Sequence, residues 1–273
     1  MEAIAKISAT RNKKVNKLEL LKPLRSIDEA YAKIADYAKS GYESIEPHDM
    51  DFFLKCFGIF DRPQTPGLFM MRVRIPGGQL STGQAAALGI IATKYGNDYI
   101  DITTRMQIEF RYLKIEDMPA ILAGLDAIGI SSYQTGVDNF RNILNDPLDG
   151  EAFDNVIPCQ KLLMDMQEIF YKNNDWIGSL PRKFNIGILG SYSNRNNIYG
   201  QDCCFVLALK DGEYGFNVYL GGRVGEIAQD ANIFVKIDEA KPFLEALITI
   251  FKTYGFRDNR NKNRLHFFIE TIG

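Results

Sequence analysis

Cysteine is scarce in this chain of 273 residues, which contains only Cys56, Cys159, Cys203 and Cys204. No two of them have the Cys-x-x-Cys spacing that is typical of zinc sites and iron–sulfur clusters. Cys203 and Cys204 are adjacent, so in a strand their side chains would point to opposite faces. We therefore expect four free thiols in a reducing compartment, and no metal centre built from this chain alone.

Histidine, net charge and long apolar runs are also in short supply. His48 and His266 are the only histidines and lie far apart, which disfavours a histidine metal site. The net charge of −2 disfavours a general nucleic-acid surface, which normally needs a strong basic excess. No apolar run is long enough to cross a bilayer, and residues 1–21 have no signal-peptide core. The sequence thus predicts a cytoplasmic protein with neither a membrane nor a nucleic acid as partner.

The first 62 residues have the pattern of a helical N-terminal leader. Apolar side chains recur at helical spacing over residues 27–37. Ser26 precedes this run and Glu29 follows three residues later, which is the pattern of a capping box. Residues 49–60 are consistent with a second helix or a covering loop, and a proline-rich boundary follows.

Residues 63–135 show the element order of a ferredoxin-like half-domain. Pro76-Gly77-Gly78 provides a turn after the first strand. The expected order is strand, helix, strand, strand, helix, which leaves one sheet edge in need of a partner. The predicted elements are a strand at 68–75, a helix at 81–95, strands at 98–103 and 107–113, and a helix at 117–128.

Residues 136–273 predict a second α/β unit. Asp211-Gly212 suits the tight turn of a hairpin. The fold class is therefore α+β, with a helical leader, a ferredoxin-like half-domain and an α/β domain in that order. The predicted elements of the second unit are a helix at 152–171 interrupted near Pro158, strands at 184–189, 203–209 and 214–220, and helices at 239–254 and 264–272.

Basic residues recur where the predicted strands end or bend. Arg72 and Arg74 are two apart in an apolar strand, so both should face the same side. Each cation alone could be an ordinary surface charge. Burying several unpaired cations is costly, however, and guanidinium groups match carboxylates and phosphates well, so the set predicts a pocket for a ligand with several anionic groups. The set comprises Arg72, Arg74, Arg105, Arg111, Arg141, Arg182 and Lys183.

Several of these cations stand within motifs that resemble those of the sirohaem-dependent nitrite and sulfite reductases. The motifs occur in the family's order and at credible spacings, and they cover about residues 50–273. An ordered series is far more specific than a single motif. The matching segments are 69–78, 102–108, 134–142, 180–185, 215–217, 221–222 and 255–260.

The resemblance implies roles for individual residues. Arg74 and Arg141 match arginines that bind the substrate anion, and Lys183 matches an active-site lysine that supplies protons. Arg105 matches an arginine that pairs with sirohaem carboxylates. Positive charge and acidic groups are what reduction of an oxyanion requires. Weaker candidates are Arg72 and Arg182 beside the substrate, and Gln107, Glu109, Arg111 and Asn142 beside the cofactor.

Some positions distinguish this chain within the family. Asn185 stands where sulfite reductases usually have a second lysine, and one positive charge fewer suits the nitrite monoanion better than the sulfite dianion. Met106, Glu109 and Arg111 replace the glutamine, glutamine and histidine that are usual there. Glu109 and Arg111 share a strand face and could form an ion pair. The resemblance therefore favours nitrite, with sulfite as the alternative.

The family's 4Fe-4S cluster is held by four cysteines of a second, homologous half. The resemblance therefore implies that this chain is an N-terminal half without the cluster ligands. The complete enzyme would reduce nitrite to ammonia with sirohaem and electrons from ferredoxin, and a separately encoded C-terminal half is a possible partner. One alternative is half of a sulfite reductase. The other is a non-catalytic module that binds sirohaem or another anion, and Glu109 and Arg111 favour this second alternative.

Overall fold

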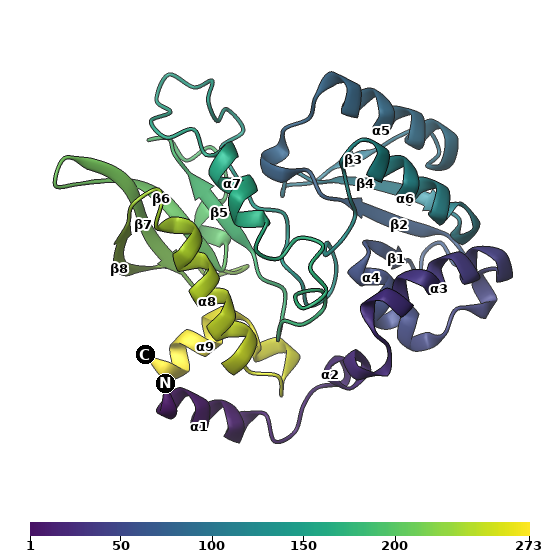
Figure 1. The fold of residues 1–273 in the computed structure, drawn as a ribbon, viewed down its shortest axis with the longest axis horizontal. Helices are drawn as coiled ribbons and strands as arrows, with labels where there is room; N and C mark the ends of the chain where they lie inside the picture. Colours follow the sequence, from purple (N-terminus) through teal and green to yellow (C-terminus); the bar gives the residue numbers. More distant parts are fainter.

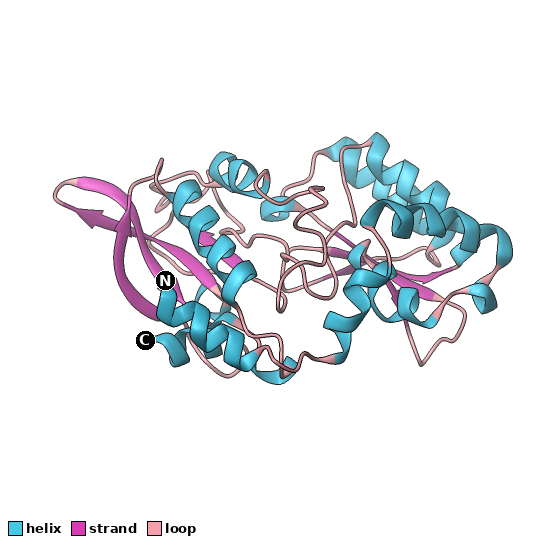
Figure 2. Ribbon diagram, turned by 60° about the horizontal axis from the view of Figure 1, so that its bottom comes forward, coloured by secondary structure: helices cyan, strands magenta, loops and turns pink.

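The computed structural model describes residues 1–273 and contains two four-stranded sheets, each with its own hydrophobic core. The sheets lie towards opposite ends of the molecule, with irregular loops between them (Figures 1 and 2). The predicted fold class, a ferredoxin-like half-domain followed by an α/β domain, is confirmed. None of the helices is both long enough and apolar enough to span a membrane.

The first sheet has the strand order β1-β2-β4-β3 and is antiparallel throughout. A capping box formed by Ser81 and Gln84 begins its first covering helix. The sequence analysis missed β1, which is only three residues long and lies in the leader, where it pairs with the open edge of β2. The elements are β1 (Ile59–Asp61), β2 (Phe69–Val73), α5 (Thr82–Tyr95), β3 (Asp101–Ile102), β4 (Ile108–Leu113) and α6 (Met118–Ala127).

The second sheet has the order β5-β6-β7-β8, with β5 parallel to β6 and the other pairs antiparallel. The predicted hairpin is confirmed, since Asp211 and Gly212 both have positive φ, at 53° and 81°, as its tight turn requires. The elements are α7 (Gln160–Gln167), β5 (Ile186–Leu189), β6 (Cys203–Lys210), β7 (Glu213–Leu220), β8 (Gln229–Val235), α8 (Ala240–Tyr254) and α9 (Leu265–Ile272).

Two predicted elements of these units were wrong in extent, and one strand was not predicted. The helix expected over 152–171 is confined to Gln160–Gln167, because the Asp149 carboxylate accepts the backbone N–H groups at its start, at 2.9 Å. The strand expected at 98–103 is reduced to Asp101–Ile102, since the chain before it has positive φ. Strand β8 was missed because most of its residues are exposed and show no clear apolar alternation.

The leader connects the two cores. Ile4 and Ile7 pack against the core of the second sheet, whereas Leu18, Leu21 and Ile27 pack against that of the first. Figure 1 shows the leader running along the lower edge of the molecule, from α1 beside α8 to α3 beside the first sheet. The predicted capping box of Ser26 and Glu29 is present. The leader helices are α1 (Glu2–Arg11), α2 (Lys17–Leu21), α3 (Ile27–Ser40), a π-helical turn (Asp49–Phe53) and α4 (Leu54–Cys56).

Candidate functional site

A cavity of about 450 Å³ opens where the loop after β3 meets the second unit. We call it the basic cavity, because four cations line it: Arg105, Lys183, Arg223 and Arg264. Asn185 and Gln201 also line it, and Glu226 is its only acidic residue. A hollow of similar size beside α3 and α6 is mostly apolar, and its single cation, Lys172, is paired with Asp126. Of the cations predicted from the sequence, Arg105 and Lys183 line the basic cavity.

Arg105 and Lys183 carry charge in the basic cavity without any carboxylate partner. Burial lowers the pKa of Arg105 to about 10, and its guanidinium donates a hydrogen bond to the side chain of Gln201. Burial, followed by the nearby Arg264, lowers the pKa of Lys183 from 10.5 to about 8. Both shifts have the direction expected for cations held in a partly dry and positively charged environment.

Arg141 and Arg182 belong to the same positive cluster. Arg141 is 9% exposed, and its guanidinium donates to the carbonyl groups of Gly136 and Val137 at 2.8 and 3.0 Å. Burial lowers its pKa well below the usual value, and the charge of Arg72 lowers it further. Burial also lowers the pKa of Arg182. We call Arg105, Arg141, Arg182 and Lys183 the unpaired cations, because none of them forms an ion pair while their neighbour Arg264 does.

Arg74 does not line the basic cavity, and its substrate-binding role stays a prediction. Its side chain is 1% exposed and donates to backbone carbonyl groups of residues 133–141, at 2.6 Å to Phe140 and 3.0 Å to Arg141. Strand alternation predicted a shared face with Arg72, but β2 ends at Val73 and Arg74 forms an isolated bridge with Ser131. Arg74 therefore fastens the connector between the two units.

Arg72 is the arginine of β2 that contributes charge to the positive cluster. Its side chain is 26% exposed and forms an ion pair with Glu109 at 2.7 Å. Its charge helps to lower the pKa values of Arg105 and Arg141, whereas the pKa of Arg74 shows no such influence from the cluster. Arg72 is thus electrostatically coupled to the positive cluster, whereas Arg74 is not.

Glu109 and Arg111 form the predicted ion pair, at 2.7 Å. Glu109 lies between Arg72 and Arg111, and Arg111 continues the chain of charges to Asp101, also at 2.7 Å. The side chain of Arg111 lines a separate hollow with Tyr99 and does not line the basic cavity. Glu109 therefore neutralises part of the charge of Arg72, while Arg111 is held away from the cavity.

Buried amide side chains surround the same region. Asn142 donates to the carbonyl groups of Ile75 at 2.6 Å and of Arg105 at 3.1 Å, which ties the end of β2 to the loop that carries Arg105. The side-chain nitrogen of Gln107 and the side-chain oxygen of Asn185 are buried and have no hydrogen-bond partner. Asn185 lines the basic cavity, so its unpaired oxygen is available to a polar ligand there.

The sequence analysis missed Arg264 and Arg223. Arg264, the residue before α9, forms two hydrogen bonds to the Asp202 carboxylate at 2.9 and 2.7 Å, and the backbone N–H of Asn185 donates to the same carboxylate at 2.8 Å. Arg223 follows Gly222, where a Cβ would lie 2.3 Å from two carbonyl oxygens, so only glycine fits. The Gly-Gly-Arg sequence was the available signal for Arg223, whereas nothing local marked Arg264.

The four cysteines do not form a ligand set for an iron–sulfur cluster. All are free and buried, and they are divided among three separate hydrophobic clusters. Burial raises the pKa of Cys56 and Cys204 to about 12, which disfavours the thiolates that iron binds. The one compact group of potential metal ligands is Glu46, His48 and Asp49, and the guanidinium of Arg25 contacts all three.

Comparison with known proteins finds family models and relatives of one kind, the nitrite and sulfite reductases. The family model described as "Nitrite and sulphite reductase 4Fe-4S domain" matches residues 136–273, and that described as "Nitrite/Sulfite reductase ferredoxin-like half domain" matches residues 61–128. The chain is 39% identical to a ferredoxin–nitrite reductase of Synechococcus elongatus, covering 99% of this chain and 54% of that protein. It is 36% identical to one of Leptolyngbya laminosa, covering 95% and 52% respectively.

A solved structure extends the similarity to the fold. The Mycobacterium tuberculosis NirA protein matches with a TM-score of 0.87 at 26% identity, covering 96% of this chain and 51% of that one. The chain therefore spans about half the length of the relatives it matches.

Proposed function

We propose that this chain, which belongs to the nitrite and sulfite reductase family, forms the sirohaem- and substrate-binding half of a ferredoxin-dependent nitrite reductase. The observation that carries the proposal is the group of unpaired cations around the basic cavity. Holding such a group together without direct ion pairs is unfavourable, and an anionic ligand would offset the cost. The similarity to ferredoxin–nitrite reductases supports the choice of reaction.

The basic cavity suits sirohaem, a tetrapyrrole with several carboxylates. Arg105, Arg223 and Arg264 line the cavity and would hold those carboxylates through charge-assisted hydrogen bonds. The Nε atom of Arg223 and the side-chain oxygen of Asn185 are buried without partners, so a polar ligand has atoms to satisfy there. When bound, sirohaem supplies the iron at which the substrate is reduced.

Three further residues would act on the substrate. Arg72 and Arg141 supply positive charge that attracts the anion and stabilises negative charge as it is reduced. Lys183, whose pKa is lowered to about 8, releases a proton near neutral pH more readily than an exposed lysine does. Asn185 adds no charge to this group, which favours nitrite over a dianion.

The iron–sulfur cluster and the electron donor are assigned to other parts of the assembly. The cysteines of this chain do not fit the cluster, so no electron-transfer step is derived from them. We place the cluster in a second half that carries the cysteines. We take a ferredoxin as electron donor, because the relatives are named ferredoxin–nitrite reductases. Four free thiols support a reducing compartment such as the cytoplasm.

A reconstituted enzyme tests the proposal. The chain is combined with sirohaem and with the cysteine-bearing half of the Synechococcus elongatus relative, reduced ferredoxin is supplied, and ammonia and sulfide are measured. We expect ammonia from nitrite to exceed sulfide from sulfite, and Lys183→Met to lower nitrite reduction by roughly 10²-fold or more. Lys241→Gln is the matched control, because Lys241 forms an exposed pair with Glu168 outside the basic cavity.

The same assay separates the alternatives. Sulfide formation that exceeds ammonia formation would identify half of a sulfite reductase. Uptake of sirohaem with neither product would identify a non-catalytic binding module. Full activity of Lys183→Met would refute the role given to Lys183.

A further inference from the structure

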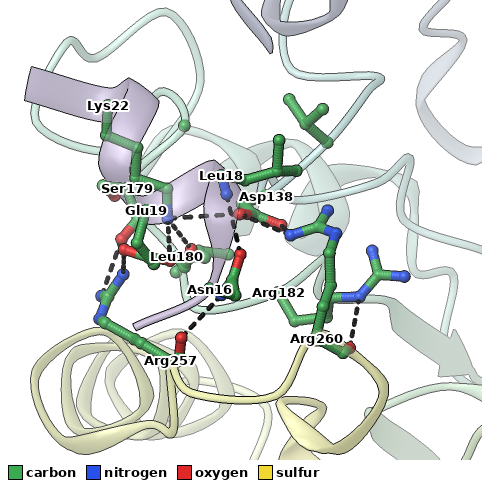
Figure 3. Close-up of polar contacts among 12 residues, drawn as sticks. Asn16, Leu18, Glu19, Lys22, Asp138, Ser179, Leu180, Arg182, Arg257 and Arg260 are labelled. Atoms are coloured by element: carbon green, nitrogen blue, oxygen red, sulfur yellow. Dashed lines mark hydrogen bonds and ion pairs between the residues drawn. The ribbon is translucent and has the colours of Figure 1, made fainter. Parts of the chain in front are cut away.

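The leader contacts the loop that carries Lys183, which we call the 179–183 loop. Lys22 Nζ donates to the carbonyl oxygen of Leu180 at 2.7 Å. Arg257, from the segment after α8, donates to the carbonyl oxygen of Ser179 at 3.0 Å. Figure 3 shows Lys22 reaching the loop from the leader and Arg257 reaching it from the segment after α8. Consecutive carbonyl groups just before Arg182 and Lys183 are therefore held by two cations from distant parts of the sequence.

Glu19 is the anion that both cations share. Its Oε1 atom lies 2.5 Å from Lys22 Nζ, and its Oε2 atom lies 2.8 Å from Arg257 Nη1. The Glu19 side chain is only 9% exposed, so solvent screens these pairs less than it would at an open surface. Asn16 reinforces the arrangement, since its side chain donates to the carbonyl oxygen of Arg257 at 2.7 Å. One carboxylate of the leader thus orients both groups that hold the loop.

The rest of the 179–183 loop is held from the same side. Arg182 Nε donates to the carbonyl oxygen of Arg260 at 3.3 Å, and Arg260 pairs with the fully buried Asp138 at 2.8 Å. Lys22 Nζ lies 3.3 Å from the same carboxylate of Asp138. The contacts therefore connect the leader, the connector and the segment after α8 around one short loop (Figure 3).

We propose that Glu19 is a positioning residue which, through Lys22 and Arg257, fixes the 179–183 loop and thereby the Lys183 ammonium at the basic cavity. The inference rests on the proposed function only for the importance that it gives to Lys183. It assigns to the leader a part in building the site, although Glu19 and Lys22 lie outside the matched family segments.

The surroundings of Lys183 provide a readout that stability alone would not move. Burial lowers its pKa, and the charges of Arg264, Arg141, Arg182 and Arg105 lower it further. If the loop is released, the ammonium gains water and moves away from these cations, so its pKa rises. Removing the negative charge of Glu19 by direct electrostatics alone would instead lower that pKa. The sign of the change therefore separates positioning from simple charge loss.

The experiment uses the full chain with Glu19→Gln. The protein is treated briefly with an amine-acylating reagent at a series of pH values, and the modification of Lys183 is measured by mass spectrometry of its peptide. We expect the wild-type midpoint near 8, and an upward shift of about one unit in Glu19→Gln. Lys17→Gln is the matched control, because it removes an exposed pair with Asp51 from the same leader helix.

Each outcome decides the inference. An unchanged or lower midpoint in folded Glu19→Gln overturns it, as does an equal upward shift in Lys17→Gln. If Glu19→Gln does not fold, Asn16→Ala removes the hydrogen bond to the Arg257 carbonyl oxygen without changing any charge and should raise the midpoint; an unchanged midpoint there overturns the inference. No step requires nitrite reduction, so failure of the proposed function would leave this result interpretable.

Discussion

Replacing Lys183 by methionine should stabilise the folded chain at neutral pH while removing a functional group. Lys183 forms no ion pair, and four arginines lie near enough to lower its pKa. Below a pH of about 8 the folded protein must therefore hold a charged ammonium in unfavourable surroundings. Methionine has a comparable length and keeps the apolar part of the packing without the charge.

The magnitude follows from the pKa of Lys183, which falls from 10.5 to about 8 in the folded protein. At ~1.4 kcal/mol for each pKa unit, the full shift corresponds to roughly 3 kcal/mol. Because the side chain is partly exposed, solvent screening reduces this to about 1–2 kcal/mol. The unfolded chain binds the proton more tightly, so the penalty is complete below pH 8 and is lost as the pH rises to 10.5.

Urea unfolding of wild type and Lys183→Met at neutral pH and at about pH 10 tests this reasoning. We expect the variant to be more stable by about 1–2 kcal/mol at neutral pH, and the difference to shrink strongly at the higher pH. Lys241→Met is the control, because Lys241 forms an exposed pair with Glu168 and should change stability little. A variant less stable than wild type at neutral pH, or a gain independent of pH, would refute the reasoning.

Two other substitutions test the roles of Arg74 and Glu109 in the structure. Arg74→Met should destabilise the chain by about 3–5 kcal/mol in urea unfolding, because it leaves several buried carbonyl groups without donors; a loss below about 1 kcal/mol would contradict the structural role. Glu109→Gln removes the carboxylate that neutralises Arg72, so sirohaem should bind several-fold more tightly in an absorption titration; weaker binding would contradict the electrostatic account.

The fold was largely predictable because most elements carry local signals. Ser26 and Ser81 each begin a helix with a capping box, and Asp211-Gly212 closes the hairpin. The missed elements lack such signals. Strand β1 is three residues long, and β8 is mostly exposed. The start of α7 is set by Asp149, whose carboxylate accepts the backbone N–H of Cys159, ten residues later. A contact over that separation cannot be predicted from the periodicity of apolar residues.

The site was predictable in its charges but not in its geometry. The unpaired cations were all identified from motifs. Their clustering is visible in the pKa values of Arg141 and Lys183, which the charges of the other members lower. The different surroundings of Arg72 and Arg74 were not predictable, because alternation assumes that a strand continues, and β2 ends between them. Arg264 was missed because its partner Asp202 is 62 residues away, so no local pattern could reveal the pair.

The central claim is that the cations of the basic cavity hold sirohaem, and an absorption titration tests it most directly. The purified chain is titrated with sirohaem in three forms: wild type, Arg105→Gln combined with Arg223→Gln, and Lys241→Gln as control. Our account predicts that wild type and control bind alike, and that the double variant binds at least about tenfold more weakly, since charged hydrogen bonds are lost. Equal affinity in all three forms, or no uptake by the wild type, would contradict it.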